Sequence, residues 1–355
     1  MSRNVVSILI SLIIFPLILA AGGYFFLNNF MNTPKYHDKS EEYIKIESGM
    51  PPAAIARKLE SEDIVSSSTL LLAYIRIFGE GSRLKAGEYK FPSPISPYAV
   101  LSMLEQGSVR SIKFTVPEGS TRFDIARRMS EKLELEPAVS EAEILKSMDN
   151  VSLISDIAPE APNLEGYLYP ATYDVPVGAS AEEVIKMMVE QFRKIWKPEF
   201  TQKAASMSLS PHKIITIASL LETESAVERE RPLIASVIYN RLSRGIPLGI
   251  DQTAVYVAKM EGRWDGTINK SDLEDDSPYN TRRHNGLPPG PIASPSVASI
   301  EAALNPATTD YLYFVRNVEA NDGSHWFYSN AGDFEKGKAK YQPWLEKQRE
   351  NKKNQ

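Results

Sequence analysis

Residues 210–225 read SPHKIITIASLLETES, and this stretch decides the core of the fold. Ser210 followed by Pro211 is typical of a helix start, with serine as the N-cap and proline at the first helical position. The apolar residues that follow recur at helical spacing: Ile214, Ile217, Ala218 and Leu221. The pattern therefore predicts a helix that buries one face.

Two carboxyl groups close this predicted helix. At about 100° per residue, Glu222 and Glu224 fall near opposite edges of the apolar stripe. A partly desolvated carboxyl has a raised pKa and can hold a proton near neutral pH, as general acid catalysis requires. Periodicity does not decide between the two glutamates. It also leaves open the alternative that both are solvated or paired with Arg229 or Arg231.

The chain after this helix alternates between one further helix, long loops and short strands. Pro232 to Leu242 has an apolar face and ends at Gly245, which predicts a second helix. Three polar, aromatic or proline-rich loops follow, at residues 251–253, 277–281 and 286–292. Residues 311–315 predict a strand and 325–327 a second one, separated by a turn at Gly323.

The chain before the helix contains a repeated unit. Residues 44–46 and 112–114 each predict a short strand, followed by a glycine turn and an amphipathic helix. The glycines, Gly49 and Gly119, are 70 residues apart, and each precedes an Ile-Ala-Arg triplet by six residues. Pattern alone predicts two small α+β modules that act as a spacer or as a glycan-binding surface.

Residues 5–27 form an uncharged stretch of 23 residues. As a helix it would extend about 34 Å, enough to cross a hydrocarbon core of ~30 Å. With Arg3 before it, we expect the N-terminus in the cytoplasm and the bulk of the chain outside. The alternative is a cleaved signal peptide, which the length of the apolar run disfavours. Residues 28–42 are expected to form a polar tether.

Composition excludes several classes of function. The chain has no cysteine, so disulfides, Cys-ligated zinc, iron–sulfur clusters and a lipid-bearing cysteine are excluded. Its four histidines are widely separated, and we expect no metal and no cofactor. A net charge of −5 gives no basic field for binding nucleic acid.

The ordered motifs resemble those of one family, the YceG-like endolytic murein transglycosylases of the bacterial inner membrane. The matching segments are residues 85–89 (KAGEY), 165–170 (EGYLYP), 218–224 (ASLLETE), 230–231 (ER), 235–237 (ASV), 240–242 (NRL), 279–281 (YNT), 286–292 (GLPPGPI) and 313–315 (YFV). The resemblance covers nearly the whole chain.

The resemblance implies cleavage of the MurNAc–GlcNAc bond within peptidoglycan strands, leaving a 1,6-anhydro-MurNAc end. It implies Glu224 as the catalytic residue, and Glu224-Ser225 also fits the Glu-Ser pair of lytic transglycosylases in general. The remaining expected site residues, which support Glu224 or bind the glycan, are Glu222, Ser225, Asp251, Tyr279, Asn280, Thr281 and Glu165.

Asp251 is the best candidate for a second acid, which would make the protein a hydrolytic muramidase with the same substrate. A non-catalytic glycan-binding scaffold of the cell-wall synthesis machinery is the other alternative. The chain departs from the family pattern at Ala171, Gly249, Gln252 and Ser296, which places glycan contacts there in doubt.

The expected fold class is α+β, with small LysM-like modules and a mixed catalytic domain whose helical core carries Glu224. The expected layout is a cytoplasmic tip (1–4), membrane helix (5–27), tether (28–42), LysM-like module (43–110), second repeat-like module and hinge (111–162), catalytic domain (163–341) and polar tail (342–355), of which residues 347–355 are expected to fray. The expected location is the bacterial inner membrane, single-pass, with the catalytic domain in the periplasm. Candidate partners are peptidoglycan strands, penicillin-binding proteins and the elongation or division machinery.

Overall fold

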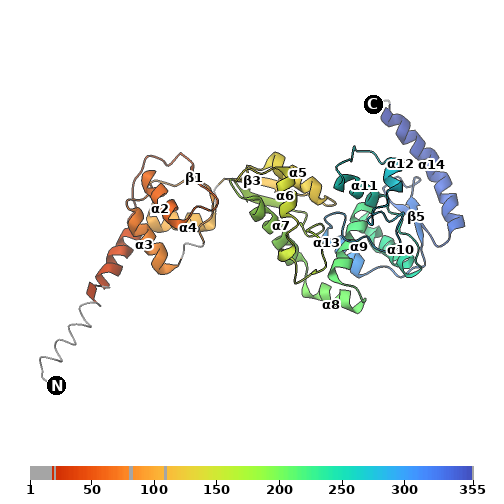
Figure 1. Cartoon of the computed structure of the whole chain (residues 1–355), viewed down its shortest axis with the longest axis horizontal. Helices are drawn as coiled ribbons and strands as arrows, with labels where there is room; N and C mark the ends of the chain where they lie inside the picture. The colour runs from red at the N-terminus through yellow and green to blue at the C-terminus, as the bar shows by residue number, and fades with distance from the viewer. Residues whose placement is uncertain (1–17, 20, 80–82, 108–109, 354–355) are drawn as a thin grey trace, which may run out of the picture. The chain divides into compact units, whose positions relative to one another are not determined.

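The computed structural model describes residues 18–19, 21–79, 83–107 and 110–353, which form an α+β fold divided into two compact units. Unit 1 comprises residues 1–113, 133–138 and 174–180, and unit 2 comprises residues 114–132, 139–173 and 181–355 (Figure 1). β3 (Ser111–Thr115) and β4 (Thr172–Pro176) form a two-stranded sheet, and each of these strands contributes residues to both units.

Unit 1 is built around a two-stranded antiparallel sheet. β1 (Ile44–Ile46) pairs with β2 (Gly87–Tyr89), and the helices α2 (Pro52–Ser61) and α3 (Ser68–Phe78) lie between them in sequence. α4 (Pro97–Gln106) follows and is capped at its C-terminal end by Gly107. The core contains large side chains that are almost fully buried: Leu59, Leu71, Tyr89, Phe91 and Leu101.

Residues 21–32 are helical and lead directly into unit 1. Met31 is buried in the unit 1 core, and Lys35 pairs with Ile95 in an antiparallel bridge. Residues 28–42, expected to form a polar tether, are therefore attached to this unit through these two residues. Most of the predicted membrane segment lies outside the described residues, and none of the helices within them is long and apolar enough to cross a bilayer.

Unit 2 is mainly helical. Its helices are α5 (Arg122–Lys132), α6 (Glu141–Ser147), α7 (Ala181–Ile195), α8 (Pro198–Ser206), α9 (Pro211–Glu224), α10 (Arg231–Ser243), α11 (Asp251–Met260), α12 (Lys270–Glu274), α13 (Val297–Leu304) and α14 (Ala331–Lys353). Two 3₁₀ turns, η2 (Val151–Leu153) and η3 (Glu228–Glu230), and an antiparallel hairpin of β5 (Tyr313–Arg316) and β6 (His325–Tyr328) complete it.

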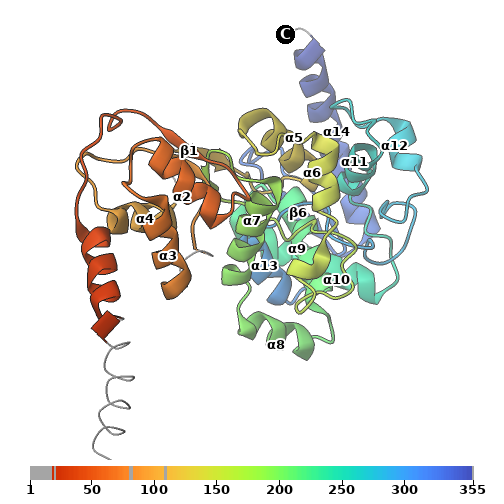
Figure 2. The ribbon, with the colours of Figure 1, turned by 60° about the vertical axis from the view of Figure 1, so that its left-hand side comes forward.

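α9 is the central helix of unit 2, packed against α8, α10, α11 and α13 (Figures 1 and 2). Its start is as predicted, because the Ser210 side chain accepts a hydrogen bond from the backbone N–H of Lys213. Burial is wider than predicted, since every residue from 214 to 221 is buried. Thr216 and Ser219 can be buried because the hydroxyl of each donates a hydrogen bond to a backbone carbonyl within the helix.

The C-terminal stretch differs from the expected fraying tail. Residues 331–353 form α14, which continues through Pro343. The Phe334 ring stacks on Tyr313 with centroids 4.8 Å apart, and the Arg316 guanidinium lies over the Trp344 ring. These contacts with β5 hold a polar helix whose own composition predicts little packing.

Candidate functional site

Glu224 is the last residue of α9, and its carboxyl makes no hydrogen bond or ion pair with any residue that the structure describes. Burial, with a smaller contribution from the negative charge of Asp251, raises the pKa of Glu224 to about 7. A group with this pKa is protonated in a large fraction of molecules at neutral pH. It can therefore donate a proton and later take one back.

Ser225 ends the helix in an extended conformation, with φ −97° and ψ 106°. Its hydroxyl donates to the carbonyl of Val227 at 2.9 Å, and its backbone N–H still bonds to Leu221. The side chain is therefore used to shape the turn after Glu224.

Asp251 is the first residue of α11 and has a cation as its partner. Its carboxylate accepts a hydrogen bond from Arg282 at 2.6 Å, and both side chains are about half exposed. The structure thus brings Asp251 into the electrostatic surroundings of Glu224 but leaves it ion-paired at the surface.

Glu222 is held by two other elements. One carboxylate oxygen accepts from Arg231 at 3.2 Å, and the other accepts from the backbone N–H and hydroxyl of Ser296 at 2.8 and 2.6 Å. The Glu222 side chain is only 5% exposed. This network joins the end of α9 to the starts of α10 and α13, so Glu222 has a partner set that Glu224 lacks.

Glu165 is a second buried carboxyl of unit 2. It accepts from the backbone N–H of Arg122 at the start of α5, and it interacts with the hydroxyl of Tyr256. Burial raises the pKa of Glu165 to about 7, although Arg122 opposes that shift. The Tyr256 ring contacts Tyr279 with centroids 5.0 Å apart, which connects Glu165 to the 277–281 loop.

The three residues of that loop differ in accessibility. Tyr279 is partly exposed, whereas Asn280 and Thr281 are buried. The Asn280 amide donates to backbone carbonyls, the nearest being that of Asp275 at 2.7 Å. The Thr281 hydroxyl bonds to Thr253 and to the backbone of Ile250. Only Tyr279 presents a side chain for stacking on a sugar ring; the other two fix the loop.

The loop at residues 165–170 is fixed at Gly166 and Tyr167. Gly166 has φ +82°, and a Cβ there would come within 2.6 Å of Pro291. The hydroxyl of Tyr167 lies 2.8 Å from Nδ1 of His212, whose Nε2 lies 3.1 Å from the carbonyl of Pro289. Because a carbonyl only accepts, Nε2 carries the proton and Nδ1 accepts from Tyr167.

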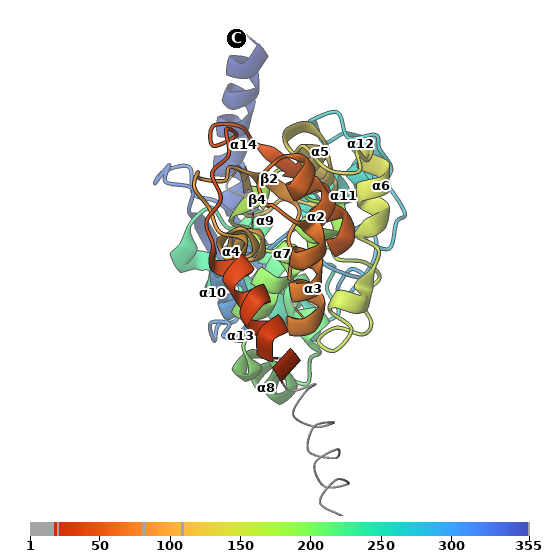
Figure 3. The ribbon, with the colours of Figure 1, turned by 90° about the vertical axis from the view of Figure 1, so that its left-hand side faces the viewer.

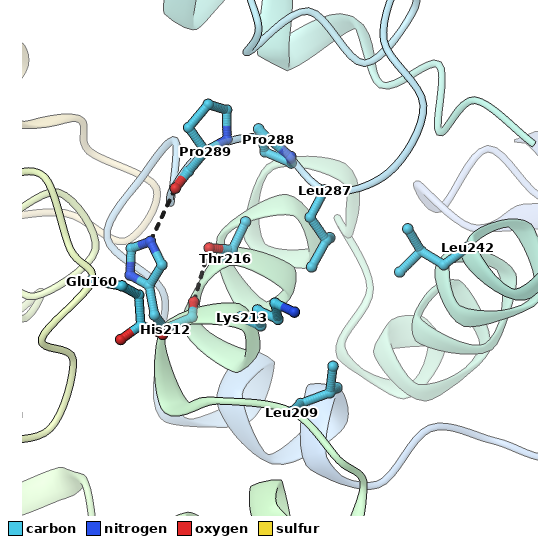
Figure 4. Close-up of a pocket in the computed structure, with 9 residues that line it drawn as sticks. All are labelled: Glu160, Leu209, His212, Lys213, Thr216, Leu242, Leu287, Pro288 and Pro289. Carbon is cyan, nitrogen blue, oxygen red and sulfur yellow. Dashed lines mark hydrogen bonds between the residues drawn. The ribbon is translucent and has the colours of Figure 1, made fainter. Parts of the chain in front are cut away.

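A cavity of about 470 Å³ lies at the opposite end of α9 from Glu224. Figure 4 shows its lining, which is Glu160, Leu209, His212, Lys213, Thr216, Leu242, Leu287, Pro288 and Pro289. From His212 to Glu224 the helix rises about 18 Å, at 1.5 Å per residue. The cavity therefore does not contain the candidate catalytic carboxyl.

Two contacts of the candidate site were missed from the sequence. The Arg282–Asp251 pair joins residues 31 apart in the chain, and no local pattern reports it. Ser296 precedes the apolar run of α13, and it is that helix's N-cap. A serine directly before an apolar run of helical spacing predicts an N-cap, so the sequence did contain a signal for this residue. Within the described residues, no group of three or more histidine, aspartate or glutamate side chains could hold a metal ion.

Fold and site together define an α+β protein with a desolvated, unpaired carboxyl at the end of a buried helix, an arrangement suited to general acid catalysis. The YceG-like family profile matches residues 44–340, and the chain belongs to this family. It is 33% identical over 343 residues to the endolytic murein transglycosylase of Bacillus subtilis (strain 168), with 91% of each chain covered.

Further relatives agree. A Streptococcus pneumoniae serotype 2 protein, also named endolytic murein transglycosylase, is 29% identical over 370 residues, covering 95% of this chain and 66% of its own. The crystal structure of a YceG-like protein from Listeria monocytogenes superposes with a TM-score of 0.55 at 32% identity. That match covers 83% of this chain and 97% of the Listeria chain.

Proposed function

We propose that this chain, a lytic transglycosylase, is an endolytic murein transglycosylase that uses Glu224 as its general acid and base. The substrate is the MurNAc–GlcNAc bond within a glycan strand. The observation that carries the proposal is the unpaired carboxyl of Glu224, with its pKa raised to about 7 by burial. The names of the relatives support the reaction class.

The proposed reaction needs one carboxyl. Protonated Glu224 gives its proton to the glycosidic oxygen, and the bond from that oxygen to C1 of MurNAc breaks. The C6 hydroxyl of the same MurNAc attacks C1, and the Glu224 carboxylate takes the hydroxyl proton. The products are a 1,6-anhydro-MurNAc end and a GlcNAc with a free hydroxyl, and no water is consumed.

The supporting roles follow from the contacts. Glu222, tied to Arg231 and Ser296, positions the end of α9. Asp251 raises the pKa of Glu224 through its charge, and Ser225 shapes the turn. Tyr279 offers a ring for the glycan, while Asn280, Thr281 and Glu165 hold its loop and the neighbouring elements in place.

The neighbourhood of Asp251 favours one alternative, a hydrolytic muramidase. A hydrolase needs a second carboxylate that activates water. Asp251 is near enough to influence Glu224, but its carboxylate is held in an ion pair with Arg282. The two reactions differ in product, because hydrolysis leaves a reducing MurNAc end.

The location is also part of the proposal. We infer that residues 5–27 anchor the chain in the bacterial inner membrane as a single span, with the catalytic unit in the periplasm. The uncharged sequence of this segment supports it. Unit 1 is proposed to bind glycan as a LysM-like module, and the cell-wall synthesis machinery remains the candidate partner.

The test is mass spectrometry of the ends released from purified peptidoglycan by the full chain. The Glu224→Gln variant is expected to lose activity by about 10²–10⁴-fold, the usual contribution of general acid–base catalysis. Glu228→Gln is the matched control, since this glutamate is exposed four residues later. It should retain activity.

Three outcomes would contradict parts of the proposal. Reducing ends in place of anhydro ends would indicate a muramidase and direct attention to Asp251. Undiminished activity of Glu224→Gln would remove Glu224 from the mechanism. Binding of glycan without cleavage by the unsubstituted chain would favour the scaffold.

A further inference from the structure

Helix 21–32 joins unit 1 without a flexible linker. Met31 is 1% exposed within the unit 1 core, Leu27 is 8% exposed, and Phe30 packs against the same core. Leu27 and Met31 are four residues apart and so lie on one face of the helix. A membrane helix ending near Leu27 would hold unit 1 directly at the bilayer surface.

The same helix face shows how far along the helix the contacts with the rest of unit 1 extend. Tyr24 is three residues before Leu27, on the face that Leu27 and Met31 bury, yet it is 62% exposed. Phe25 and Phe26 are exposed as well. The rest of unit 1 therefore buries this face of the helix as far as Leu27 and leaves Tyr24 exposed. Exposed aromatic residues such as Tyr24 are expected at a membrane interface.

α3 runs back toward that level. Lys35, just beyond helix 21–32, donates to the backbone of Asp63 and lies 3.5 Å from the carbonyl of Val65, shortly before α3 begins. α3 therefore starts beside the C-terminal end of helix 21–32. In Figures 2 and 3 its other end points the same way as the N-terminal end of that helix.

The end of α3 that points this way is apolar and uncovered. Ile77 is 66% exposed and Phe78 is 46% exposed, and the exposed Arg76 precedes them. The Phe78 ring contacts the ring of Tyr74, one turn earlier on α3, with centroids 4.5 Å apart, and stays 46% exposed. Two side chains are too few for a stable protein–protein interface, which needs about 800 Å² per partner.

We propose that the C-terminal end of α3, led by Ile77 and Phe78, inserts into the headgroup layer of the membrane that holds the anchor. This inference rests on the membrane anchor proposed above. The occupant is the phospholipid bilayer because the apolar end of α3 points the same way as the N-terminal end of helix 21–32, where Tyr24, Phe25 and Phe26 are exposed. Arg76 can pair with lipid phosphates there. Unit 1 is then fixed to the membrane at two points.

The absence of cysteine makes the test direct. Single cysteines are introduced into the full chain at Tyr24, Phe78 and Tyr36, and each is labelled with bimane. The labelled proteins are placed in nanodiscs of phosphatidylethanolamine and phosphatidylglycerol, with or without a nitroxide near the headgroup end of the acyl chain. Tyr36 is the matched control: an exposed aromatic residue next to Lys35, at the opposite end of α3 from Phe78.

The proposal expects the nitroxide to quench the labels at positions 24 and 78 but not at position 36. Adding Ile77→Glu should abolish quenching at position 78 and leave it unchanged at position 24. Quenching at 24 without quenching at 78 would overturn the docking of α3 and retain the anchor. Absence of quenching at 24 would overturn the anchor itself. Disulfide cross-linking of two unlabelled chains through the cysteine at position 78, without quenching in the labelled protein, would replace the lipid by a second copy.

Discussion

The carboxyl of Glu224 sets the pH dependence of the proposed reaction. Its pKa of about 7 reflects burial and the charge of Asp251. The acid form is needed first, so activity should decline as pH rises above about 7. Asp251→Asn removes a negative charge that favours the protonated form, so the pKa of Glu224 should fall. The descending limb of the kcat/KM profile should therefore move to lower pH.

Arg282→Gln provides the control for this shift. It breaks the same ion pair but keeps the negative charge of Asp251. The descending limb should stay in place or move to higher pH. If both variants moved it to lower pH, the ion pair and not the charge of Asp251 would govern Glu224.

Glu165 makes a separate prediction about stability, again at the level of one residue. Its pKa is about 7 in the folded chain, against 4.5 ordinarily, so the folded state retains a proton that the unfolded state releases. The contribution of Glu165 to the free energy of unfolding should therefore fall as pH rises from about 4.5 to 7, by on the order of 3 kcal/mol. Urea titrations of the Glu165→Gln variant and the unsubstituted chain measure the difference between their free energies of unfolding. This difference should favour the variant more at pH 8 than at pH 5. An unchanged difference would contradict the raised pKa.

At the level of elements, Glu222 connects three helices. Glu222→Ala would leave the mostly buried Arg231 without its carboxylate and remove the contact to the start of α13. We expect a loss of about 3–5 kcal/mol in the free energy of unfolding, measured by chemical denaturation. Ser296→Ala, which removes the hydroxyl that caps α13, should cost only about 1 kcal/mol. Equal costs would indicate that Arg231 is not held by Glu222.

Local signals predicted individual elements better than their surroundings. Ser210 and Pro211 gave the start of α9, and the 311–315 and 325–327 runs gave the β5–β6 hairpin. The sequence left Arg229 and Arg231 open as partners of the glutamates, and tertiary packing selected Arg231 for Glu222. The burial of Asn280 and the packing of residues 28–42 depend on contacts far apart in the chain, which periodicity does not report. The role of Glu224 still rests on the proposal.

At the level of the whole molecule, unit 1 depends on segments from the middle of the chain. Val177 donates its backbone N–H to Arg110, and Glu136 pairs with Lys45. A chain that begins at residue 114 would lack both partners and should expose Leu133, Leu135 and Val177. We expect increased binding of a hydrophobic dye and earlier elution in size-exclusion chromatography than for a compact monomer of that length. A compact monomer without dye binding would show that these segments need no partner.

The segments of the two units alternate along the chain, and this order limits how recombination can exchange one unit. Unit 1 is encoded in three separate stretches, of which two lie inside the region encoding unit 2. A single recombination event cannot exchange the whole of unit 1 for that of another protein, since it would carry over only the first stretch. An exchange that keeps unit 1 intact therefore has to replace all three stretches at once.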